Sequence, residues 1–243
     1  MCRIAAFPPK FPKEHALKII SRFAKGNGDG TGSVYVKNGE FVVNKWPLSL
    51  AKVVYRDYPL LDHMPHNGWT IVHLRAASHG ENTTENTHPF IKGKYAVIHN
   101  GIWSEYSLAK AAMKPYVDFD GETDSEVAAQ LLANVGPKNF GRLVDWGGVF
   151  MALHQNGELW AVKTSGDLEM QKTNYGYLIA STLPEYLVAD EQPEGYLRFS
   201  KTGKLLEQHK YRISYKTIIP AVETATVGPF KSEETKPKFG HPW

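Results

Sequence analysis

The sequence predicts an α+β fold in which antiparallel β-sheets have helices laid against them. Short apolar runs typical of strands outnumber the amphipathic stretches typical of helices. Several of these runs come in pairs joined by turn residues, which indicates hairpins and therefore antiparallel pairing. No internal repeat or linker-like segment interrupts the chain. We therefore expect one domain over residues 1–227, followed by a Pro- and Lys-rich tail over residues 228–243 that packs little.

The first half of the chain predicts strands, one hairpin and an amphipathic helix. Residues 26–32 are rich in glycine and predict a loop. Asn38-Gly39 is a turn sequence that favours a hairpin between the apolar runs on either side of it. Strands are expected in four segments: residues 2–7, the two arms of the hairpin at 33–43, 68–78 and 94–101. A helix is expected over residues 13–25, where four apolar residues share one face: Ala16, Ile19, Ile20 and Phe23.

The second half predicts further helices and a series of strands. The clearest helix spans residues 123–136, where Thr123 as N-cap and Glu126 three residues later form a capping box. Ser104 is expected to cap another helix, and a short helix is expected over residues 138–145. Strands are expected in four later segments: residues 148–154, 159–164, 176–182 and a hairpin within 196–213.

Composition excludes several classes of protein. The chain has 243 residues, a formal net charge of +3 and scattered Lys and Arg residues, which argues against a nucleic-acid partner. A single cysteine excludes an intrachain disulfide. The first residues carry no apolar run of signal-peptide length, and no segment approaches the length that spans a bilayer. We therefore expect a cytoplasmic protein with no membrane partner.

Cys2 is the only cysteine, and it follows the first methionine directly. If that methionine is removed, the thiol and a free α-amine share one α-carbon. Such an amine has a pKa near ~8, so part of it is an unprotonated base at neutral pH. An N-terminal residue can thus be both nucleophile and base. Taken alone, however, this cysteine is equally well explained as a chance residue of a first strand, so other residues must decide.

Three stretches decide: "HLRAASHGENTTENTHPF" at 73–90, "AVIHNGIWSEYSL" at 96–108 and "GETDSEVAAQLL" at 121–132. In order and spacing behind Cys2, they resemble the motifs of class II glutamine amidotransferases. The resemblance implies an N-terminal-nucleophile hydrolase fold, in which two antiparallel sheets are sandwiched between helices (αββα). It also implies that Cys2 attacks the side-chain amide of L-glutamine, that no metal or other cofactor takes part, and that ammonia is produced.

The resemblance assigns roles to six further residues. Asn100 and Gly101 occupy the oxyanion-hole positions, and a side-chain NH2 with a backbone N–H suits that chemistry. Arg75 suits the substrate α-carboxylate through its fork of donors, and Asp124 suits the α-ammonium. Simpler explanations exist for both: an internal ion pair for Arg75, and the helix dipole for Asp124. The resemblance also places two residues at the substrate pocket: Ala76 and His79.

Four histidines lie close together in the sequence: His73, His79, His88 and His99. Their spacing resembles no zinc pattern, so we expect them to order loops by hydrogen bonding. The sequence also departs from the family pattern in two places. The glycine-rich loop keeps Asp29, Gly30 and Gly32 but lacks the usual arginine, and Ala76 stands where an aromatic residue is common.

The length of the chain bears on the partner. After residue 190 about fifty residues remain, which is too few for an acceptor domain. We therefore expect a stand-alone glutaminase domain that supplies ammonia to a separate synthetase. Two alternatives stay open. The same site could hydrolyse γ-glutamyl or other linear amides, or the chain could be a non-catalytic binding subunit.

Overall fold

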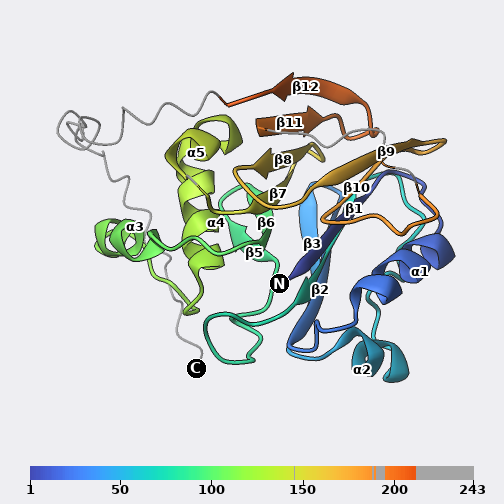
Figure 1. Ribbon diagram of the computed structural model, residues 1–243, viewed down its shortest axis with the longest axis horizontal. Coiled ribbons are helices and arrows are strands. Elements are labelled where there is room, and N and C mark those ends of the chain that lie inside the picture. Colours follow the sequence, from blue (N-terminus) through green and yellow to red (C-terminus); the bar gives the residue numbers. More distant parts are fainter. Residues whose placement is uncertain (145, 188, 190–194, 212–243) are drawn as a thin grey trace, which may run out of the picture. The chain divides into compact units, whose positions relative to one another are not determined.

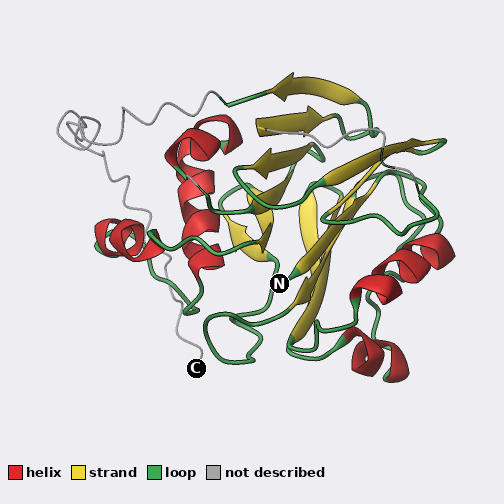
Figure 2. Cartoon of the chain, in the orientation of Figure 1, coloured by secondary structure: helices red, strands yellow, loops and turns green. Residues whose placement is uncertain are grey.

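The computed structural model describes residues 1–144, 146–187, 189 and 195–211. In this part of the chain, two antiparallel six-stranded sheets lie face to face, with helices on their outer sides (Figures 1 and 2). This arrangement confirms the predicted α+β class and the αββα layering. The expected boundary between domain and tail, at residues 227 and 228, lies outside the described residues.

The first sheet has the strand order β3-β2-β4-β1-β10-β9, so it combines the first four strands of the chain with two later ones. Its strands are β1 (Arg3–Phe7), β2 (Gly30–Lys37), β3 (Glu40–Trp46), β4 (Thr70–Arg75), β9 (Glu169–Thr173) and β10 (Gly176–Ala180). The second sheet has the order β12-β11-β8-β7-β6-β5. Its strands are β5 (Phe90–Lys92), β6 (Tyr95–Asn100), β7 (Val149–His154), β8 (Leu159–Lys163), β11 (Gly195–Phe199) and β12 (Leu205–His209).

Helices cover the outer faces of the two sheets (Figure 2). The first sheet packs against α1 (Lys13–Phe23) and α2 (Leu50–Tyr55). The second packs against α4 (Asp124–Val135) and α5 (Pro137–Leu143), with α3 (Tyr106–Met113) beside them. None of the helices in the described residues is long and apolar enough to cross a membrane.

The central strands are buried on both faces, which explains their continuous apolar sequences. In β1, Ile4 and Ala6 face the core between the sheets, whereas Ala5 and Phe7 face α1. The inner core joins both sheets, for example through Ile4 on the first and Ile98 on the second. The alternation of side chains along each strand therefore decides which residues point toward the opposite sheet.

Several predicted elements are confirmed with small changes. The helix α1 buries the four residues expected on its apolar face. The hairpin turns at Asn38-Gly39, where both residues have positive φ, of 53° and 82°. The predicted loop at 26–32 is wrong at its end, because β2 already begins at Gly30, which pairs with Arg75 of β4.

The predicted helix starts are partly wrong. Ser104 does not cap a helix: α3 begins after Glu105, which makes no side-chain capping bond. At α4 the Thr123 hydroxyl accepts the Glu126 N–H, as the capping box requires. The Glu126 carboxylate does not complete the box, however. It accepts the backbone N–H groups of Asp120 and Gly121 and pairs with Lys92 at 2.7 Å. Three elements have no counterpart among the expectations: α2, β5 and β9.

Gly32 of β2 lies against the chain segment that leads into β5. A Cβ atom at this position would be 2.0 Å from the carbonyl oxygen of His88. A carbon and an oxygen that are not bonded to each other cannot approach that closely. Any side chain at this position therefore forces the strand and the segment apart.

We expect Gly32→Ala to lower the free energy of unfolding by ~1–3 kcal/mol or more, because the added methyl group overpacks this contact. Chemical denaturation monitored by circular dichroism measures the change. Gly28→Ala is the matched control, because nothing lies within 4 Å of a Cβ atom there. Equal stability of the two variants would contradict the close packing of β2.

Candidate active site

Strand register places the start of β1 and the end of β4 at the same end of the first sheet. β1 and β4 are antiparallel and pair Arg3 with Leu74. The start of β1 therefore lies beside the end of β4. Cys2 directly precedes β1, close to the chain end marked N in Figure 1, and Arg75 is the last residue of β4.

A hydrogen bond between the sheets aligns the second sheet with this edge. The His73 ring Nε2 lies 3.0 Å from the carbonyl oxygen of His99, and both residues are buried. The end of β4 thus faces the end of β6, where Asn100 and Gly101 follow. Burial lowers the pKa of His73 to about 3, so the ring is neutral and donates to the carbonyl.

Side-chain alternation turns the end residues toward one another. Ile4 and Ile98 point into the space between the sheets. Cys2 and Asn100 are each two positions away from one of them, so they share the inner faces of their strands. Arg75 is likewise two positions beyond His73, which reaches across to β6. Register and alternation thus place these three predicted residues at the same end of the sandwich.

The thiol of Cys2 is half-buried and points to the end of β4. Its Sγ donates to the carbonyl oxygen of Ala76 at 3.5 Å. Burial raises the pKa of the thiol, and the nearby Asp124 carboxylate raises it further. The Ala76 contact, the N-terminal ammonium and Arg75 act in the opposite direction on this pKa. Arg75 and Asp124 are therefore both close enough to influence the sulfur electrostatically.

The corner at Asn100 and Gly101 is tightly built. A Cβ atom at Gly101 would lie 2.3 Å from the carbonyl oxygen of Gly147, so only glycine fits. The preceding His99 fastens the corner: its Nε2 lies 2.6 Å from Gly147 O and its Nδ1 lies 2.9 Å from Ser125 Oγ. The amide oxygen of Asn100 is buried and has no hydrogen-bond partner among the described residues. A donor on a bound molecule could satisfy that oxygen.

Asp124 is 3% exposed and begins α4. Its Oδ2 accepts the backbone N–H of Trp103 at 2.8 Å and lies 3.9 Å from His99 Nδ1. The first turn of a helix favours this negative charge, as the simpler explanation requires. Its position near Cys2 is also compatible with a substrate ammonium, so that role stays a prediction.

Arg75 is 3% exposed, and its guanidinium donates to the loop that follows β4. Nη1 donates to Glu81 O at 3.1 Å and to Asn82 Oδ1 at 2.8 Å. Nη2 donates to His79 O at 2.7 Å and to Gly80 O at 3.2 Å. These acceptors are neutral, so within the described residues Arg75 organises the loop and makes no internal ion pair. Its role toward a substrate carboxylate stays a prediction.

The remaining predicted residues lie on the same loop or beneath it. Ala76 supplies the carbonyl that accepts the thiol, and His79 is exposed, with its ring Nδ1 3.2 Å from Ser78 Oγ. His88 is buried and stacks on His73 with ring centroids 3.8 Å apart. Neither of its ring nitrogens has a hydrogen-bond partner among the described residues, so the prediction that it orders a loop by hydrogen bonding is wrong. Within the described residues, no three His, Cys, Asp or Glu side chains are arranged to hold a metal ion.

Sequence reasoning missed two connections at this edge. Asp29 Oδ2 accepts the Ala77 N–H at 2.8 Å, and its Oδ1 accepts the side-chain N–H of Asn82 at 3.1 Å. Asp29 was noted only as a retained residue of the glycine-rich loop. An aspartate between glycines is a signal for such loop bonding, but its partner cannot be read from the sequence.

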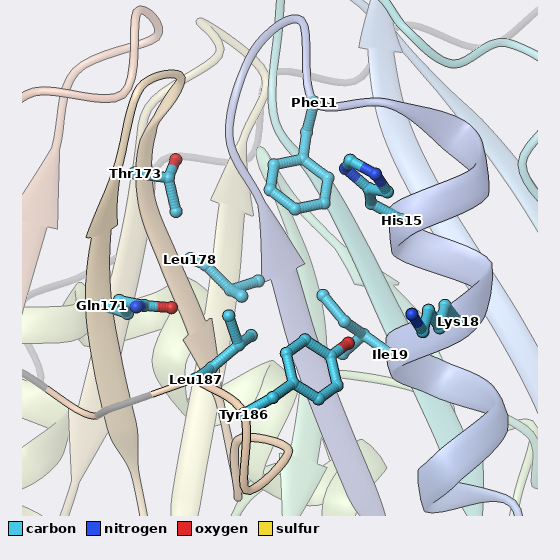
Figure 3. Close-up of a pocket in the computed structure, with 9 residues that line it drawn as sticks. All are labelled: Phe11, His15, Lys18, Ile19, Gln171, Thr173, Leu178, Tyr186 and Leu187. Atoms are coloured by element: carbon cyan, nitrogen blue, oxygen red, sulfur yellow. The ribbon is translucent and has the colours of Figure 1, made fainter.

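A separate pocket of about 240 Å³ lies on the outer side of the first sheet, beside α1 (Figure 3). Its walls are mainly apolar and come from α1, β9, β10 and the segment after β10. It is lined by Phe11, His15, Lys18, Ile19, Gln171, Thr173, Leu178, Tyr186 and Leu187. None of the predicted site residues lines it, so it is distinct from the edge that holds Cys2.

Comparison with known proteins bears on this site. A family model described as class-II glutamine amidotransferases matches residues 47–174. The chain is 35% identical over 124 residues to glutamine–fructose-6-phosphate aminotransferase (isomerizing) of Aquifex aeolicus, covering 48% of this chain and 20% of that protein. The same enzyme of Wigglesworthia glossinidia brevipalpis is 40% identical over 76 residues, covering 31% of this chain and 12% of that protein. These alignments span about a fifth or less of each relative.

Solved structures agree on the fold. The chain superposes on glutamine phosphoribosylpyrophosphate amidotransferase from B. subtilis with a TM-score of 0.71, covering 88% of this chain and 50% of that one. Sequence identity in this comparison is 17%, so it supports the fold alone.

Iodoacetamide alkylates the thiolate form of Cys2. In chains that retain Met1, we expect the alkylation rate to rise with pH at a higher pH than for an exposed cysteine, because burial raises the pKa of the Cys2 thiol. Asp124→Asn should move the pH profile down, and Arg75→Met should move it up, because the two charges act oppositely on the thiolate. Mass spectrometry of timed samples measures the rates, and circular dichroism checks folding. Shifts in the same direction for both variants would contradict this electrostatic arrangement.

Proposed function

Because this chain belongs to the class II glutamine amidotransferases, we propose that it hydrolyses the side-chain amide of L-glutamine through Cys2. The matched range begins at residue 47, so the assignment of Cys2 rests on its place in the fold. The observation that carries the proposal is the meeting of Cys2, Arg75 and the Asn100-Gly101 corner at one end of the sandwich.

The proposed reaction starts once Met1 is removed, which frees the α-amine of Cys2. The amine takes the thiol proton, and Sγ attacks the side-chain carbonyl carbon of glutamine. The amine then returns the proton to the leaving nitrogen, so that ammonia departs and a γ-glutamyl thioester remains. Water hydrolyses the thioester, which releases glutamate and restores the thiol. A basic amine is required here because burial disfavours the free thiolate.

The oxyanion of the tetrahedral intermediate is assigned to Asn100 and Gly101. A side-chain NH2 and a backbone N–H are suitable donors, and a tightly packed corner holds them in place before reaction. The unpartnered oxygen of the Asn100 amide is an acceptor, so it would take a different part: a substrate or terminal amine N–H could donate to it.

The amino-acid end of glutamine is assigned to Arg75 and Asp124, which read its carboxylate and ammonium. Both lie near the sulfur, as their opposite effects on its pKa indicate. The loop residues Ala76 and His79 are assigned to the wall of the same site. Ammonia is then proposed to pass to a separate acceptor synthetase, and no metal or other cofactor is assigned to the hydrolysis. The domain is proposed to extend over residues 1–227.

We expect the purified protein to lack Met1 by intact mass and to release glutamate from glutamine. Cys2→Ser should reduce this turnover by ~100-fold or more, because a hydroxyl is a weaker nucleophile than a thiol. The glutamine-analogue diazoketone DON should add covalently to Cys2 in the wild type alone. A chain with Met1 removed that neither turns over glutamine nor takes up DON would refute the proposal and favour a non-catalytic subunit.

A panel of substrates separates glutamine from other γ-glutamyl amides. We expect kcat/KM for glutamine to exceed that for larger γ-glutamyl amides, and glutarate monoamide, which lacks the ammonium, to be a poor substrate. Asp124→Asn should remove the preference for glutamine over glutarate monoamide, since the Asp124 carboxylate is the proposed partner of the substrate ammonium. A higher kcat/KM for a γ-glutamyl alkylamide would assign the chain to the alternative hydrolase instead.

A further inference from the structure

The guanidinium of Arg75 has its terminal N–H groups fully engaged. Nη1 and Nη2 carry two N–H groups each, and each nitrogen donates to two acceptors in the loop at residues 79–82. A carboxylate that binds an arginine through two parallel bonds uses at least one of these terminal groups. Binding of a substrate carboxylate to Arg75 therefore requires that one of the present acceptors leave.

The four acceptors differ in how easily they can leave. Three are backbone carbonyl oxygens, of His79, Gly80 and Glu81, and moving any of them means moving the loop backbone. The fourth is the side-chain amide oxygen of Asn82, at 2.8 Å from Nη1. Asn82 is exposed, so a rotation of its side chain into solvent frees one N–H of Nη1 for one carboxylate oxygen, with no backbone change.

A second contact fixes which end of the Asn82 amide faces Arg75. Its Nδ2 donates to Asp29 Oδ1 at 3.1 Å, so the amide oxygen is turned toward the guanidinium. Asp29 is itself anchored, because its Oδ2 accepts the backbone N–H of Ala77 at 2.8 Å. These hydrogen bonds in series thus hold the neutral amide oxygen of Asn82 on the buried guanidinium of Arg75.

We propose that the Asn82 amide oxygen occupies the position of one substrate carboxylate oxygen on Arg75 and, by competing for it, lowers the affinity for the substrate carboxylate. This inference rests on the proposed function, in which Arg75 reads the amino-acid end of glutamine. A charged carboxylate displaces the neutral amide because charge-assisted hydrogen bonds are the stronger ones. The apparent affinity is then the intrinsic affinity multiplied by the fraction of molecules in which Asn82 has left Arg75.

The test compares two substitutions at one position. Asn82→Ala removes the competing oxygen, so KM for glutamine should fall ~3- to 10-fold, with kcat within about twofold of the wild type. Asn82→Asp replaces the neutral oxygen on Arg75 by a charged one, which outweighs the repulsion from Asp29 on its other side because Arg75 is the buried cation, so KM should rise ~10-fold or more. Thr84→Ala is the matched control: a neutral, exposed residue of the same loop is truncated, and KM should not change.

A purely structural role for Asn82 predicts a different result. Loss of loop support would raise KM, lower kcat or lower the melting temperature in both variants. A rise of KM in Asn82→Ala therefore overturns the inference, whereas opposite shifts in the two variants support it. The melting temperature of each variant is measured alongside.

Calorimetric binding of L-glutamate in a Cys2→Ser background separates this inference from the proposed function. If Cys2→Ser binds L-glutamate and Cys2→Ser/Asn82→Ala binds it no more tightly, the role of Asn82 is refuted and the proposed function is not. Absence of glutamate binding together with absence of glutamine turnover in the wild type refutes the proposed function and this inference with it.

Discussion

The hydrogen bond from the His73 ring to the carbonyl oxygen of His99 is the contact on which the arrangement of this protein depends. It crosses the apolar layer between the two sheets and sets the end of β4 opposite the end of β6. Both groups are buried, so loss of either partner leaves a polar group without water, at a cost of ~1–3 kcal/mol. Burial also keeps His73 neutral, which lets it donate to the carbonyl over a wide pH range.

Close backbone contacts complete this frame. Gly32 lets β2 lie against the segment before β5, and Gly101 lets the end of β6 lie against Gly147. Side chains at either position would separate elements that come from different parts of the sequence. The end of the sandwich that holds Cys2 is thus fixed by close backbone contacts at glycines and by buried histidines.

Electrostatics at this end is a balance of opposing charges around a buried sulfur. Burial and Asp124 disfavour the thiolate, whereas Arg75 favours it. A thiol kept protonated in this way depends on a nearby base, which the proposed mechanism assigns to the α-amine of Cys2. The same Arg75 also ties down the loop at 79–82, so loop order and charge at the sulfur are linked through one side chain.

Much of this could be predicted from the sequence, because strands and helices leave local patterns. The apolar face of α1, the turn at Asn38-Gly39 and the Thr123 cap are set by neighbouring residues and were predicted correctly. The family and the αββα fold were predicted from motifs in order along the chain. Short elements such as β5 and β9 escaped, since their few residues gain stability mainly from pairing with distant strands.

Only the tertiary structure decided what each polar side chain contacts. The sequence singled out Arg75 and Asp29 but not Asn82, which links them, because the bond from Asn82 to Asp29 joins segments 53 residues apart. It assigned Arg75 to a substrate carboxylate, with an internal ion pair as the simpler alternative, and could not show that three backbone carbonyl oxygens would take its N–H groups. Local composition thus determined the elements and the kind of chemistry. The partners of buried charges were decided by packing, since desolvated groups bond to whatever acceptor the fold brings within reach.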